Sequence, residues 1–136
     1  MGIQLNTSGL HHVALRVTDL ERAKRFYTQV LGFSNVILDI PGALFLFTVG
    51  GSIVGVRGPD AKTPPGDRFD PFRVGLDHVA IACPSVEELN RTAAALREAG
   101  VEVIGPKTDE FAGMRFPYIA FRDPDGIKWE YYAQET

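Results

Sequence analysis

The sequence predicts an α+β fold made of two tandem units, each with the element order strand, helix, strand, strand, strand. The first observation behind this prediction is an internal repeat, because LHHVAL at residues 10–15 returns as LDHVAI at residues 76–81. The second is that each copy is followed by an acidic helix start and then by apolar runs typical of strands. A chain of 136 residues is long enough to bury its own core, so we expect a single domain.

Within this domain we expect module one at about residues 8–57, a linker at about residues 58–74 and module two at about residues 75–134. The linker is identified by composition. Residues 58–73 contain four of the nine prolines, together with glycines and mixed charge, and show no periodicity. This pattern is typical of a surface connection.

Module one opens with a strand over residues 10–17, because large aliphatic residues share one face and His12 lies on the other. Thr18 and Glu21 have the spacing of a capping box, and apolar residues then recur at helical spacing until Gly32. Turn dipeptides PG and GG separate the apolar runs that follow. These runs predict three strands, at residues 33–40, 43–49 and 52–56.

Module two repeats this order, with His78 at the place of His12 in a strand over residues 76–83. Ser85, with Glu88 as its capping partner, begins a helix that Gly100 ends. The remaining strands are expected at residues 101–104, 118–122 and 127–132. The polar segment at residues 107–115 has little pattern and is expected to be a loop, either a plain connection or a lid over a site.

Composition and charge exclude several classes of function. Fourteen Lys and Arg against seventeen Asp and Glu give a net charge of −3, which disfavours nucleic acid and membrane surfaces as partners. The N-terminal residues lack the pattern of a secretory signal. The single cysteine, Cys83, has apolar neighbours and is expected to be a buried, inert thiol. We therefore expect a cytoplasmic protein whose partner is a small molecule.

Two histidines at matching positions and an acid in the last strand are candidates for a metal site. His12 and His78 lie opposite the aliphatic face of their strands, each followed two residues later by alanine, which leaves room beside the ring. Glu130 is the acid whose strand face suits such convergence. Two imidazoles and one carboxylate leave coordination positions open, an arrangement typical of non-haem Fe(II) that also accepts Mn, Zn, Ni or Co. His11 has the opposite strand parity and is left out.

Several motifs resemble the vicinal oxygen chelate superfamily, which contains glyoxalases, bleomycin-resistance proteins and extradiol dioxygenases. They are LHHVALRVTDL at residues 10–20, FY at 26–27, LGF at 31–33, and DPDG at 123–126 followed by Glu130. The resemblance covers essentially the whole chain. It implies paired β-α-β-β-β modules that form a curved mixed sheet around a cleft, metal ligands at His12, His78 and Glu130, and a homodimer.

The chain departs from each subfamily of this group. Gly55 falls opposite Glu130 when the modules are superposed, so the fourth protein ligand of the glyoxalase I type is missing. Ala120 stands where an extradiol dioxygenase is expected to have a tyrosine, and the chain has no fourth histidine to serve as the additional histidine expected near the metal in that group. Ala14 stands where fosfomycin-modifying relatives are expected to have a threonine. The reaction therefore stays open between ring-cleaving oxygenation, lyase or isomerase chemistry, and nucleophilic transfer.

Other side chains share the strand face of these ligands. Three cations are candidates to hold an anionic substrate, or face water at strand ends: Arg16, Arg122 and Lys128. Two aromatic residues either line the cleft or pack: Tyr118 and Tyr132. Three aliphatic residues of module one form an expected apolar wall, which favours a partly hydrophobic substrate: Leu44, Leu46 and Ile53.

We therefore expect a divalent-metal-dependent enzyme that acts on a small, partly apolar substrate chelated through its oxygen atoms. Ring-cleaving oxygenase and lyase or isomerase chemistry are the reaction types considered. The alternative is a metal-free drug- or metabolite-binding protein of the bleomycin-resistance kind, which needs no ligand triad.

Overall fold

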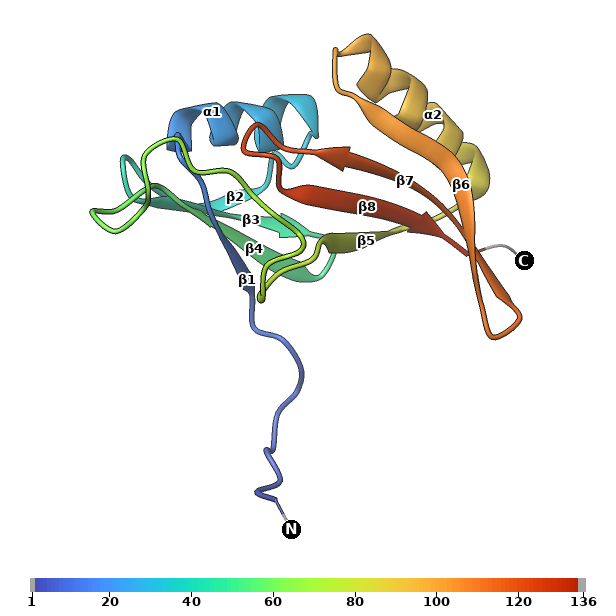
Figure 1. Ribbon diagram of the computed structural model, residues 1–136, viewed down its shortest axis with the longest axis horizontal. Coiled ribbons are helices and arrows are strands. Elements are labelled where there is room, and N and C mark those ends of the chain that lie inside the picture. The colour runs from blue at the N-terminus through green and yellow to red at the C-terminus, as the bar shows by residue number, and fades with distance from the viewer. Residues whose placement is uncertain (1, 135–136) are drawn as a thin grey trace. The chain divides into compact units, whose positions relative to one another are not determined.

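The computed structural model describes residues 2–134 and divides the chain into two compact units, Met1–Thr63 and Pro64–Thr136. The division falls within the predicted linker. Each unit contains the element order strand, helix, strand, strand, strand (Figure 1). No helix among the described residues is long and apolar enough to cross a membrane.

The first unit is a four-stranded mixed sheet with one helical segment. Its elements are β1 (Val13–Arg16), α1 (Leu20–Arg25), the π-helical continuation η1 (Phe26–Val30), β2 (Val36–Ile40), β3 (Leu44–Val49) and β4 (Ser52–Arg57). The strand order is β1-β4-β3-β2, with β1 parallel to β4 and the other neighbours antiparallel.

The second unit repeats this topology. Its elements are β5 (Val79–Cys83), α2 (Val86–Glu98), β6 (Val103–Phe111), β7 (Met114–Arg122) and β8 (Lys128–Ala133). The strand order is β5-β8-β7-β6, and β5 is parallel to β8. The predicted α+β fold of two β-α-β-β-β modules is confirmed, and neither sheet closes into a barrel.

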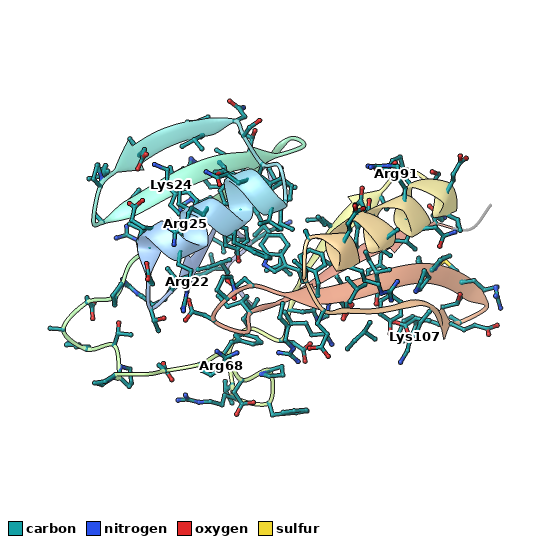
Figure 2. The ribbon with its side chains drawn as sticks, turned by 90° about the horizontal axis from the view of Figure 1, so that it is seen from above. Arg22, Lys24, Arg25, Arg68, Arg91 and Lys107 are labelled. Carbon is teal, nitrogen blue, oxygen red and sulfur yellow. The ribbon has the colours of Figure 1, made fainter. Side chains whose placement is uncertain are left out.

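Each helix covers one face of the sheet of its own unit (Figure 1), and that face holds the core. In the first unit Tyr27 and Phe47 are fully buried and stacked, with ring centroids 5.5 Å apart. In the second unit Trp129, Ile119 and Leu89 of α2 are fully buried. Charged side chains come from the helices as well, among them Arg22, Lys24 and Arg25 of α1 and Arg91 of α2 (Figure 2). In the second unit Glu130 follows the buried Trp129 on β8 and therefore lies on the opposite face of the sheet.

Local structure differs from the predictions in two places. Asp19, rather than Thr18, caps α1, because its carboxylate accepts the backbone N–H of Arg22. The segment at residues 107–115 is not a loop or a lid but part of the β6–β7 hairpin, whose turn residues Ala112 and Gly113 have φ of 49° and 82°. Its strands carry polar residues without apolar alternation, so the period of two gives no signal there. By contrast, Ser85 caps α2 as predicted, accepting the backbone N–H of Glu88.

The two units differ at two equivalent, paired positions. The second unit has a large residue beside a small one, and the first unit has them in the opposite order. In the second unit Glu130 of β8 lies between Ala80 of β5 and Ala120 of β7. In the first unit the same register places Gly55 between Ala14 and Leu46. A Cβ atom on Gly55 would lie 2.7 Å from Leu46 Cδ2, so Leu46 fills the space that a side chain at position 55 would need. The predicted equivalence of Gly55 and Glu130 is confirmed by this register.

Asp123 supports the turn between β7 and β8. It is 5% exposed, and its Oδ1 accepts the backbone N–H groups of Asp125 and Ile127 at 2.9 and 2.8 Å. We predict that Asp123→Ala lowers the free energy of unfolding by roughly 1–3 kcal/mol, because two N–H groups lose their acceptor. Urea unfolding followed by circular dichroism measures this change.

The control for Asp123 is Asp70→Ala. The Asp70 carboxylate is exposed and accepts only one backbone N–H, from Phe72, in the hydrogen bonds described. Water can replace it, so we expect a cost of about 0.5 kcal/mol or less. Equal costs for the two variants would show that Asp123 does not hold the turn.

A second prediction concerns Gly55 and Leu46. Gly55→Ala should lower the free energy of unfolding by about 1 kcal/mol at most, because the added methyl group overlaps only Cδ2, the far end of the half-buried Leu46 side chain, which can turn aside. In a Leu46→Ala background the same substitution should cost clearly less. The four members of this double-mutant cycle are compared by urea unfolding, and an unchanged cost in the Leu46→Ala background would contradict the steric explanation.

Candidate functional site

Strand pairing places His78 beside Glu130. Strands β5 and β8 are parallel neighbours with Ala80 opposite Glu130, and His78 lies directly before β5, two residues from Ala80. His78 Nε2 is 3.6 Å from Glu130 Oε2. Two of the three predicted ligands are therefore brought together within one unit.

The second ring nitrogen of His78 is held by its neighbour in sequence. His78 Nδ1 lies 2.6 Å from Asp77 Oδ1, and the hydrogen bond with His78 holds the pKa of Asp77 below its ordinary value. An ionised carboxylate only accepts hydrogen bonds, so Nδ1 carries a proton, and Nε2 is the nitrogen whose lone pair can bind a metal ion. This is the usual outer contact of a metal-binding histidine.

Glu130 is an acidic residue that is nevertheless buried, with 5% of its surface exposed. Its Oε1 is 3.2 Å from the ammonium of Lys128. Its Oε2 is inaccessible and makes no hydrogen bond within residues 2–134. A buried carboxylate oxygen without a donor is costly, which requires an explanation.

A divalent cation fits the space between these two atoms. The Oε2 atom of Glu130 makes no hydrogen bond with His78, and both this oxygen and the Nε2 lone pair of the ring can ligate a cation. Two ligand atoms about 2.1 Å from a tetrahedral ion lie roughly 3.4 Å apart, close to the observed 3.6 Å. Imidazole and carboxylate are also ligands that Zn, Mn and Fe accept. The residues of this pair therefore fit a divalent metal ion.

His12, the third predicted ligand, lies in the first unit just before β1. Its Nδ1 is 2.9 Å from Nδ1 of His11, so one ring donates to the other. His11 occupies the position that Asp77 has in the repeat, and in both units the residue before the candidate ligand contacts its Nδ1. Strand parity excluded His11, but the chain is not yet in a strand at this point. No group of three His, Cys, Asp or Glu residues suited to a metal ion is found within the described part of the chain.

The three cations that share the ligand faces have different partners. Arg16 donates to the carbonyl of Gly58 at 2.6 Å, and Arg122 donates to the carbonyl of Gly126 at 2.8 Å. Both guanidinium groups therefore fasten loops of their own unit. Lys128 alone among the three contacts a candidate ligand in the interactions described.

Tyr118 and Tyr132 stack on the same face as Glu130, with ring centroids 4.9 Å apart and planes 19° from parallel. The hydroxyl of Tyr132 donates to Asp109 at 2.7 Å. Burial raises the pKa of both tyrosines, and the contacts with Asp109 and Glu130 add to the rise at Tyr132. Both hydroxyls thus remain protonated at neutral pH. Asp109 was missed in the sequence because it lay in the segment expected to be a loop.

The predicted apolar wall of the first unit lies on one sheet face. Leu46 pairs with Gly55, and Leu44 and Ile53 share this face through the β3–β4 register. All three aliphatic side chains are only half-buried. Cys83, also as predicted, is buried, and its thiol donates to the carbonyl of Ser85.

Comparison with known proteins identifies the family. The Glyoxalase/Bleomycin resistance protein/Dioxygenase superfamily matches residues 9–131. The uncharacterized protein YwkD of Bacillus subtilis (strain 168) is 32% identical over 129 residues, covering 92% of this chain and 96% of its own. A catechol-2,3-dioxygenase of the same organism is 32% identical over 104 residues, covering 72% of this chain but 34% of its own.

A solved structure supports the same assignment. Lactoylglutathione lyase from Agrobacterium tumefaciens superposes with a TM-score of 0.67 and 25% sequence identity, covering 93% of this chain and 94% of that chain. The family match spans most of the sequence, and the β-α-β-β-β topology agrees with it. The chain therefore belongs to the Glyoxalase/Bleomycin resistance protein/Dioxygenase superfamily.

Proposed function

We propose that this protein is a divalent-metal-dependent enzyme that acts on a small, partly apolar substrate chelated through oxygen atoms. The observation that carries this proposal is the unpartnered, buried Oε2 of Glu130, 3.6 Å from Nε2 of His78. A buried carboxylate oxygen without a hydrogen-bond donor is costly in a purely structural role.

His78 Nε2, Glu130 Oε2 and His12 would hold the ion, with Asp77 and His11 orienting the two rings through their Nδ1 atoms. The ion would act as a Lewis acid on bound oxygen atoms. The half-buried aliphatic face of the first unit suits an apolar part of the substrate. Tyr118 and Tyr132, both protonated, would present polar, uncharged hydroxyl groups on the face of Glu130.

The reaction type is proposed as ring-cleaving oxygenation or lyase and isomerase chemistry. The similar proteins include both a catechol-2,3-dioxygenase and a lactoylglutathione lyase. Gly55, with Leu46 filling the space beside it, leaves the first unit without a carboxylate at the position of Glu130. This absence disfavours a reaction that needs a second acidic ligand to move a proton. We further propose a cytoplasmic homodimer.

The proposal predicts that metal binding depends on His12, His78 and Glu130. His78→Ala and Glu130→Gln should each lower the affinity for Mn²⁺ or Zn²⁺ by more than the roughly 10–100-fold that loss of an outer-shell partner costs. His12→Ala should have a similar effect. Affinities are measured by isothermal titration calorimetry, and metal content by elemental analysis of protein purified without added metal.

Glu110→Gln provides the matched control, because Glu110 is an exposed acid on strand β6 of the same unit. It should leave metal affinity unchanged, and circular dichroism should show that all variants fold. Wild-type protein that holds no ion after incubation with Fe, Mn, Zn and Ni would contradict the enzyme proposal. Binding of a small molecule in that state would instead support the metal-free binding protein.

A further inference from the structure

Lys128 makes an interaction that the proposed metal ligation does not explain. Its ammonium lies 3.2 Å from Oε1 of Glu130, and only 29% of its side chain is exposed. The side chain is half-buried, and its ammonium contacts this carboxylate rather than extending fully into water. In the metal-free protein Lys128 therefore serves as the counter-ion of the buried carboxylate, and it leaves Oε2 free on the side of His78.

The internal repeat shows that the lysine accompanies the glutamate. Both lie on β8, the last strand of the second unit, where Lys128 is opposite Arg122 and Glu130 is opposite Ala120. The corresponding residues of β4 are Ile53 and Gly55, the latter opposite Leu46. One unit thus carries both charges and the other carries neither. This joint occurrence indicates that Lys128 belongs to the charged site rather than to the general surface.

A cation held by Glu130 changes the surroundings of Lys128. The carboxylate then shares its charge with the ion, and the attraction that holds the ammonium weakens. Like charges repel, so Lys128 is not suited to tighten metal binding. An ammonium whose carboxylate partner shares its charge with a cation can pair with a further anionic group. Among the groups that can approach the open side of a metal ion, an anionic oxygen satisfies it best.

We propose that Lys128 is a specificity-determining residue that selects a substrate with an anionic oxygen, such as a carboxylate or enolate, beside the chelating atoms. This inference rests on the proposed metal-dependent function. Tyr132 and Tyr118 stand on the same sheet face and offer an aromatic surface to the rest of the molecule. The substrate class is therefore an anionic chelator with a planar or apolar body.

The test uses the full-length protein loaded with Co²⁺, whose visible absorption reports ligands that join the bound ion. Two probes share a pyridine and a five-membered chelate ring but differ in charge: picolinate is an anion, and 2,2′-bipyridine is neutral. Lys128→Met should bind Co²⁺ at least as tightly as the wild type. Its affinity for picolinate should fall about tenfold or more, the usual effect of losing a hydrogen bond between charged groups.

Two further variants complete the design. Lys128→Arg keeps the charge and should retain picolinate affinity within a few fold of the wild type. Lys107→Met removes the same charge from strand β6 of the same unit (Figure 2) and should leave both probes unaffected. The affinity for 2,2′-bipyridine should stay within about twofold in every variant, because a neutral chelator makes no charge-assisted bond.

The outcomes separate this inference from the function on which it rests. If the wild type takes up no divalent ion, both fail. If it binds Co²⁺ but picolinate and 2,2′-bipyridine respond equally to Lys128→Met, or Lys107→Met lowers picolinate affinity as strongly, only the inference fails. Should Lys128→Met not fold, a loss of picolinate affinity in Lys128→Gln, with Lys128→Arg unaffected, supports it, and unchanged affinity overturns it.

Discussion

The parallel pairing of the first and last strands is the constraint on which each unit depends. It joins β5 to β8, which are separated by a helix and a hairpin, in a register that sets Ala80 opposite Glu130. A shift of one residue would turn Glu130 into the core and Trp129 out of it. The bulk of Trp129, which is fully buried, therefore helps to keep the carboxylate on the face of His78.

Both units use this pairing, but they place different chemistry at its centre. In the second unit two alanines flank a carboxylate, and in the first a leucine lies over a glycine. The total side-chain volume of the three paired residues is roughly the same in both units, as close packing requires. Their polarity differs. The two units have the same strand arrangement, but the charges of the candidate site are concentrated in the second unit.

Much of the fold was predictable because it depends on local patterns. Strand alternation placed His78 and Glu130 on one face, and the turn dipeptides separated the strands. Three features escaped prediction for physical reasons. The β6–β7 hairpin has no apolar period, Asp109 therefore had no assigned face, and His11 precedes the strand in which parity has a meaning. The joint role of His12 with the other two ligands stays a prediction.

The histidine pair before β1 differs from the Asp77–His78 pair in how firmly the ring tautomer is fixed. Because the carboxylate of Asp77 can only accept, His78 is kept in a single tautomer. His11 and His12 are both imidazoles, so either ring can be the donor in the hydrogen bond between their Nδ1 atoms. His78 therefore has its tautomer fixed before a ligand binds, whereas His12 has to adopt one of two tautomers on binding. The two units thus differ in composition and also in the free energy needed to fix the histidine tautomer on binding.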